Sequence, residues 1–241
     1  MANNYFRFKK FVIHQDRAAM KVTTDSCFFG AWAAKEIQRE ESTIKNVLDI
    51  GAGTGLLSLM VAQLNGAEID SVEIDNEAAE QAKENVNLSL WEGRIHVFNE
   101  DILSFGPGKK YDCIISNPPF YENELASQTG KKNIAHHSYQ LTIAQVLKTI
   151  KMHLIEDGIF FLMYPFKRKE EIDALLKEHE LYLTDSVFLS QSVKHSPFRI
   201  IVKGSVVMRA STSSTSLSIW DEHQQYTKAF VDLLKDYYLY L

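Results

Sequence analysis

The sequence of 241 residues has only two cysteines, Cys27 and Cys113. They stand far apart in apolar segments, which favours two small core side chains over a disulfide or a metal-binding pair. No apolar run reaches about 18 residues, so no membrane span is expected. The first 17 residues carry charges but no continuous apolar stretch of the signal-peptide type. We therefore expect a cytoplasmic protein without a metal, either a monomer or a weak dimer.

The sequence also lacks the positive net charge that is common in nucleic-acid-binding proteins. Its 26 basic and 31 acidic residues give a formal net charge of −5. The basic residues are unevenly placed, however, and residues 1–21 hold several of them against the single acid Asp16. Any one basic cluster is typical of solvated surface, but together they could form a phosphate-contacting face. The clusters are Arg7, Lys9, Lys10, Arg17 and Lys21; Lys131 and Lys132; and Lys167, Arg168 and Lys169.

Proline and glycine are scarce, at 5 and 11 residues, and they form no linker between domains. The length and the hydrophobic content of 45% predict one large α/β domain. We divide it into an N-terminal extension and helix over 1–40, a core over 46–209 and a C-terminal helix over 217–241. Within the core, apolar segments of strand length alternate with helical segments. This alternation predicts a mostly parallel sheet with helices on both faces.

The core segments can be assigned from their apolar periodicity. We expect strands over 46–50, 68–75, 94–101, 111–116, 159–165, 181–189 and 198–209, and helices over 25–38, 56–64, 76–88, 141–154 and 167–179. The helix over 25–38 could be capped by Asp25 or Thr24. The last two strands are too close in the sequence for a crossover helix between them, so they should pair antiparallel.

The C-terminal region combines a polar stretch and an aromatic stripe. Residues 210–216, ASTSSTS, are expected to form a polar loop. Tyr226, Phe230, Leu233 and Tyr237 follow at helical spacing. We interpret this stripe as core packing, with base stacking as the alternative.

The segment from Val47 to Gly55, VLDIGAGTG, indicates a ligand site at the end of a buried strand. Gly51, Gly53 and Gly55 remove side chains where the backbone must turn sharply and approach a ligand. The fingerprint of dinucleotide sites would require glycine at position 56, which is leucine. The turn, with Asp49 two residues ahead of it, therefore suits a ligand without a pyrophosphate. A glycine-rich loop without any ligand is the alternative.

Acidic residues at the ends of the next two strands support a ligand site. Glu73 ends the second strand, where a carboxylate can accept hydrogen bonds from two ribose hydroxyls. Asp75 competes for this role, but its position favours capping the following helix. Asp101 follows the third strand and could accept a hydrogen bond from the exocyclic amine of an adenine, or could instead be a turn residue.

The tetrapeptide Asn117-Pro118-Pro119-Phe120 follows the fourth strand and is the most informative motif. Both prolines fix their own φ and restrain the residue before them, and neither has an N–H. The backbone here therefore offers acceptors and few donors, which suits a substrate with an amino group. If the Asn117 side chain and the Pro118 carbonyl each accept one N–H, the nitrogen lone pair can point at a methyl donor. Phe120 could stack on the substrate ring.

His136 and His137 suggest a general base. A methylated amine loses its proton readily, however, so the reaction needs no strong base. Two adjacent histidines in a polar segment favour a surface or substrate-contacting role.

These motifs resemble those of class I S-adenosylmethionine-dependent methyltransferases that act on amino groups. The resemblance implies a Rossmann-like, seven-stranded, mostly parallel sheet with the last strand antiparallel and helices on both faces. A closer resemblance covers nearly the whole chain and is to the bacterial tRNA1(Val) adenine-N6 methyltransferases. It is carried by residues 6–33, NPPFY at 117–121, AHH at 135–137 and the ending YTKAFVDLLKDYYL.

The closer resemblance implies S-adenosyl-L-methionine as cofactor and tRNA as substrate, with the target adenine just 3′ of the anticodon. It also implies that Lys21 and Asp25, within MKVTTD, lie near the cofactor. Three alternatives stay open: methylation of a glutamine side-chain amide in a protein, methylation of guanine N2 in rRNA, and a non-catalytic RNA assembly factor that binds the cofactor. The first would be expected to carry a separate N-terminal helical domain, but only about 40 residues precede the first strand of the core.

Overall fold

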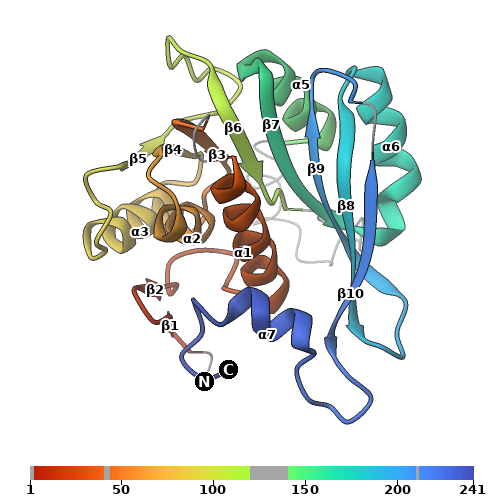
Figure 1. Ribbon diagram of the computed structural model, residues 1–241. Coiled ribbons are helices and arrows are strands. Elements are labelled where there is room, and N and C mark those ends of the chain that lie inside the picture. Colours follow the sequence, from red (N-terminus) through yellow and green to blue (C-terminus); the bar gives the residue numbers. More distant parts are fainter. Residues whose placement is uncertain (1–2, 41–43, 120–140, 210–211) are drawn as a thin grey trace, which may run out of the picture.

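The computed structural model describes residues 3–40, 44–119, 141–209 and 212–241, and an eight-stranded sheet forms its centre (Figure 1). The strand order is β10-β8-β9-β7-β6-β3-β4-β5. The strands are β3 (Asn46–Ile50), β4 (Glu68–Glu73), β5 (Ile95–Asn99), β6 (Tyr111–Ser116), β7 (Leu154–Pro165), β8 (Tyr182–Ser192), β9 (Pro197–Ser205) and β10 (Ser213–Trp220).

Five neighbouring strands, β7, β6, β3, β4 and β5, are parallel. Strand β9 lies between β7 and β8 and is antiparallel to both, which confirms the expected pairing of the two late strands. The mostly parallel α/β sheet is therefore confirmed. It has eight strands where seven were expected, because β10 adds to the edge and runs parallel to β8.

Strand β10 corrects two expectations for the C-terminal region. Most of the expected polar loop over 210–216 belongs to this edge strand, whose first four residues are exposed serines and threonines. Such a strand shows no apolar alternation, so its sequence resembles that of a loop. The expected helix over 217–241 is also wrong in its bounds, since the helix α7 spans only Lys228–Leu234. Asp221 accepts hydrogen bonds from the backbone of His223 and Gln225, and this turn separates β10 from α7.

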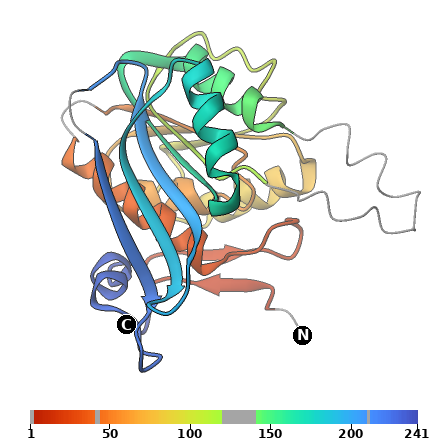
Figure 2. The same cartoon turned by 90° about the vertical axis from the view of Figure 1, so that its right-hand side faces the viewer.

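Helices cover both faces of the sheet (Figure 2). One apolar cluster packs α1 (Thr24–Arg39), α2 (Leu56–Leu64) and α7 against one face, and a second packs α5 (Ile143–His153) and α6 (Lys169–Glu178) against the other. A short 3-10 helix, η1 (Phe166–Arg168), leads from β7 into α6, and α3 (Asn76–Asn87) packs on β4 and β5. Within the ranges given above, no helix is both long enough and apolar enough to cross a membrane.

The N-cap of α1 differs from both expected residues. Thr23 caps the helix, and its side chain and that of Ser26 form a reciprocal capping box. The carboxylate of Asp25 is instead paired with Arg199 of β9, at an Nε to Oδ2 distance of 2.8 Å. The helix is thus fixed to the sheet by a side chain that local sequence assigned to capping.

The two ends of the chain lie together (Figure 1). Strands β1 (Tyr5–Arg7) and β2 (Val12–His14) form a short antiparallel hairpin that sequence periodicity did not predict. Phe8 lies in the turn of this hairpin and forms a β-bridge with Tyr238, and the Lys9 amide donates to the Tyr237 carbonyl at 2.8 Å. Phe230, Leu233 and Tyr237 are buried in the core, which confirms packing as the role of these residues in the aromatic stripe.

Candidate active site

The two expected motifs meet where the central strands end. Ile50 of β3 is the pairing partner of Ser116 of β6, and the Ser116 hydroxyl donates to the Ile50 carbonyl at 2.9 Å. Gly51 and Asn117 directly follow this pair. Since neighbouring strands lie about 4.8 Å apart, the glycine-rich turn and the Asn-Pro-Pro motif are side by side. Asn117 is half-buried, Pro118 is buried and Pro119 is exposed.

The glycine-rich turn over 51–55 needs glycine for its conformation. Gly51, Gly53 and Gly55 all have positive φ values, of 74°, 56° and 79°, a region in which side-chain-bearing residues are strained. A Cβ added to Gly51 or Gly53 would meet no atom within 4 Å, whereas one on Gly55 would contact Ala82 of α3. The first two glycines therefore leave open space above the turn, and the third allows α3 to pack closely beneath it.

Glu73, at the end of β4, holds the turn in place. Its Oε2 accepts the Gly53 amide at 2.8 Å, and its Oε1 accepts the Asp75 amide at 2.9 Å. A carboxylate has about four lone-pair positions, so two remain for ribose hydroxyls. Asp75 is the N-cap of α3 and accepts the Ala78 amide, as expected for the competing candidate.

Asp49 lies fully buried beneath the turn. Its Oδ2 accepts the Ser58 hydroxyl at 2.6 Å, while its Oδ1 has no partner among the described residues. Burial raises the pKa of the Asp49 carboxyl to about 7; the Ser58 hydrogen bond opposes this rise, and the nearby charge of Glu73 adds to it. Open space over two glycines, free lone pairs on Glu73 and an unpaired buried carboxylate oxygen suit a ligand with a ribose and a positive charge. S-adenosylmethionine has both.

We predict that Asp49 makes the cofactor-free protein less stable as pH rises. Because the folded-state pKa lies above the unfolded value near 3.9, its contribution is fully present below about pH 4 and is lost as pH rises through about 7. The ceiling on this loss is about 4 kcal/mol. Urea unfolding between pH 5 and 8 should show a steeper fall for the parent than for Asp49→Asn. Parallel stability curves for the two proteins would contradict the prediction.

The other predicted cofactor residues are Asp101, Asp25 and Lys21, and they have different surroundings. Asp101 follows β5, and its Oδ1 accepts the Leu103 amide at 2.9 Å, so it also acts as the turn residue that the sequence allowed. Asp25 is buried and held by Arg199, which pairs with Pro165 at the end of β7. Lys21 is exposed in the segment before α1. For these three residues, contact with the cofactor stays a prediction.

Several residues that support the site were missed from the sequence. Ser116 fixes the end of β6, Ser58 bonds to Asp49 and Ser71, and the Asn99 amide donates to the carbonyls of Glu73 and Ile74. Each is a polar residue at the end of a strand or inside an apolar segment. For the buried residues Ser58 and Ser116 that placement is a usable signal, because a buried polar side chain requires a hydrogen-bond partner. Phe120, Lys131, Lys132, His136 and His137 lie outside the described residues.

Comparison with known proteins identifies similar sequences over the whole chain. The family described as "Methyltransferase small domain" matches residues 34–164. A tRNA1(Val) (adenine(37)-N6)-methyltransferase from Parabacteroides distasonis is 34% identical, with 99% of each chain covered. A protein of the same description from Dyadobacter fermentans is 42% identical, over 83% of this chain and 82% of its own.

A solved structure from Agrobacterium tumefaciens, described as a predicted O-methyltransferase, shares the fold. Its TM-score is 0.64 at 17% identity, and the match covers 88% of this chain and 95% of that one. At this identity the likeness supports the fold alone.

Proposed function

Because the chain belongs to the tRNA1(Val) (adenine(37)-N6)-methyltransferase family, we propose that it methylates N6 of the adenine just 3′ of the anticodon in valine tRNA. The observation that carries this proposal is the position of Asn117 and Pro118 directly beside the glycine-rich turn, held there by the bond from Ser116 to Ile50. A methyl donor over the turn and an amino group at Asn117 would then be neighbours.

S-adenosylmethionine supplies the reaction with an electrophilic methyl group on a sulfonium. The protein's part is to hold the weakly nucleophilic amine, whose lone pair is delocalised into the adenine ring. The Asn117 side-chain oxygen and the Pro118 carbonyl each accept one N–H, which favours a tetrahedral nitrogen with its lone pair directed at the turn. Such placement of two reactants can provide effective molarities of order 10⁵–10⁸ M.

Proton release needs no dedicated base. The nitrogen would form the new C–N bond with its lone pair as the methyl–sulfur bond breaks, leaving the sulfur as a neutral thioether, and the cationic amine would then release one proton to water. Prolines at 118 and 119 donate no backbone N–H, so no donor from them competes for the lone pair. Phe120 is proposed to stack on the adenine, which lies in a single-stranded loop where bases can be splayed out.

The basic N-terminal region is proposed to contact tRNA phosphates, and the exposure of Lys9, Lys10 and Lys21 supports this. The region is also attached to the rest of the fold. The backbone amide of Arg17 donates to Gln81 of α3 at 2.9 Å, and the Lys9 Nζ donates to the Lys235 carbonyl at 2.6 Å.

A cytoplasmic location is also proposed, and the two buried cysteines without a disulfide support it.

The proposed activity can be tested by incubating the protein with labelled S-adenosylmethionine and total RNA from a strain that lacks the gene. Digestion to nucleosides should place the label in N6-methyladenosine, and RNA from the parent strain, already modified, should accept much less. Label in N2-methylguanosine would instead indicate rRNA methylation, and label in added cell protein would indicate glutamine methylation. Cofactor binding without transfer to any of these would indicate an assembly factor. Each of these three results would overturn the proposed function.

A further inference from the structure

Three buried amide side chains hold the N-terminal segment that runs from β2 to α1. Gln15 is 5% exposed, Gln81 is 1% exposed and Asn85 is fully buried. Gln15 accepts the Val22 amide at 2.8 Å and donates to the Asn3 carbonyl at 2.9 Å. These side chains therefore satisfy backbone groups of a segment that has little regular secondary structure of its own.

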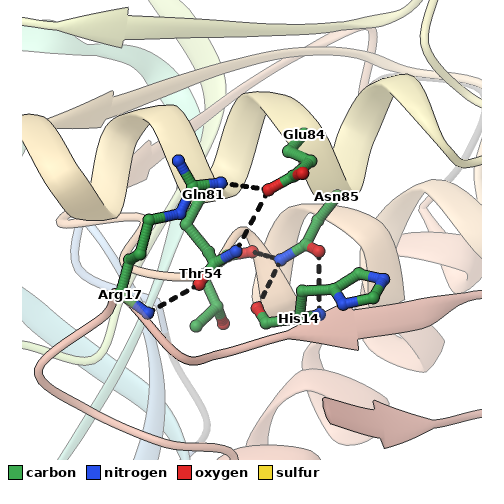
Figure 3. Close-up of polar contacts among 6 residues, drawn as sticks. All are labelled: His14, Arg17, Thr54, Gln81, Glu84 and Asn85. Carbon is green, nitrogen blue, oxygen red and sulfur yellow. Dashed lines mark hydrogen bonds and ion pairs between the residues drawn. The ribbon is translucent and has the colours of Figure 1, made fainter. Parts of the chain in front are cut away.

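Asn85, on α3, joins this segment to the glycine-rich turn (Figure 3). Its Oδ1 accepts the His14 amide at 2.8 Å, and its Nδ2 donates to the His14 carbonyl and to the Thr54 carbonyl, both at 2.9 Å. Thr54 stands between Gly53 and Gly55 in the turn. One side chain thus bonds to the backbone of two segments that are 40 positions apart (54 − 14).

The turn needs such support because its own sequence provides little rigidity. Gly51 and Gly53 have wide conformational freedom, and the site where a Cβ would stand is empty at both. Glu73 fixes the Gly53 amide from the β4 side. Asn85, on α3, fixes the following carbonyl, that of Thr54, so two side chains from different elements bond to adjacent backbone groups of the turn.

Gln81 extends the same contact to Arg17. Its Oε1 accepts the Arg17 amide at 2.9 Å, and its Nε2 donates to Glu84, which also pairs with the Arg17 guanidinium (Figure 3). Gln81 and Asn85 lie one helical turn apart on α3. Gln81 therefore holds the N-terminal segment without a bond to the glycine-rich turn, whereas Asn85 bonds to both.

We propose that Asn85 is a positioning residue of the cofactor site, and that through it the docked segment over 14–17 becomes part of that site. Docking of the segment and binding of S-adenosylmethionine then strengthen one another, because the same amide must be ordered for both. Such coupling is reciprocal: whatever loosens the segment weakens cofactor binding, and the bound cofactor tightens the segment. The inference rests on the cofactor of the proposed function and not on its RNA substrate.

The test compares cofactor affinity in Asn85→Asp, Asn85→Ala and the matched control Asn87→Asp, which changes an exposed residue on the same helix. In Asn85→Asp an oxygen replaces Nδ2 and faces the His14 and Thr54 carbonyls, while the side-chain volume is kept. Titration calorimetry with S-adenosylmethionine should show binding about tenfold weaker for both Asn85 variants and unchanged for the control. At saturating cofactor, kcat should stay close to the parent value.

A second measurement uses the parent protein alone, so it does not require a variant that folds. Hydrogen exchange at the His14 and Arg17 amides should slow when the cofactor is added.

A third measurement uses Gln81→Ala, which loosens the segment but leaves the bond between Asn85 and Thr54 in place. Its cofactor affinity should fall by a smaller factor than that of Asn85→Ala.

Two of the possible outcomes would contradict the inference, and a third would contradict the proposed function. An unchanged cofactor affinity in folded Asn85→Asp, even with a lowered Tm, would show a purely structural role and overturn the inference. Exchange at His14 and Arg17 that is insensitive to cofactor would overturn it as well. A parent protein that does not bind S-adenosylmethionine would instead overturn the proposed function.

Discussion

Asn117→Ala should lower kcat by roughly 10²–10³-fold, the usual loss when one hydrogen-bonding group that stabilises a transition state is removed. The variant loses the side-chain oxygen that holds one amino hydrogen of the substrate. The Asn117 side chain has no hydrogen-bond partner among the described residues, and the glycine-rich turn is fixed by other groups. The Kd for S-adenosylmethionine should therefore stay within about twofold of the parent. Single-turnover methylation and calorimetry measure the two quantities separately.

Asn117→Asp is the matched variant, because it keeps an acceptor oxygen at the same position. It should retain more activity than Asn117→Ala. Parent-like kcat in Asn117→Ala, or a loss fully explained by weaker cofactor binding, would contradict the role given to Asn117.

Glu73→Ala should weaken cofactor binding by about a hundredfold, since a hydrogen bond to a charged group contributes about 1.5–3 kcal/mol and more than one is lost. The change removes the proposed ribose acceptor and also frees the Gly53 and Asp75 amides. Calorimetric titration with S-adenosylmethionine at low ionic strength measures the effect.

Glu77→Ala provides a control, because Glu77 is an exposed carboxylate in the first turn of α3. Its affinity should match the parent. Glu73→Gln keeps one acceptor oxygen and should bind with intermediate affinity. Equal affinity for Glu73→Ala and Glu77→Ala would show that Glu73 does not hold the cofactor.

The sequence predicted the buried strands and the two motifs well because their signals are local. Residues 46–50 and 111–116 are short apolar segments with turn-forming residues directly after them, and the structure has strands at the same bounds. The open space over the turn also follows from its glycines. In parallel sheets the strand ends meet at one edge, so the adjacency of Gly51 and Asn117 could be expected from the fold class.

The edge strand, the hairpin and the supporting amides could not be predicted in the same way. The first half of strand β10 is exposed serine and threonine, and the strand with which it pairs, β8, lies 28 positions earlier in the sequence. Asn85 bonds to backbone atoms of His14 and Thr54. Because every residue has a backbone carbonyl, such bonds require no particular residue type at the partner position and cannot be recognised in the sequence. The only signal of Asn85 is a polar residue among the buried positions Ala82 and Val86 of α3.

The contact between the two ends of the chain has a consequence for synthesis. The Lys9 side chain meets the Lys235 carbonyl 226 positions later, and the turn at Phe8 pairs with Tyr238. At 5–20 residues per second, the first hairpin waits roughly 10–50 s before its partner leaves the ribosome. The glycine-rich turn over 51–55 is translated early in that interval. A nascent chain therefore contains this turn well before the N-terminal hairpin can form its contacts with residues 235–238.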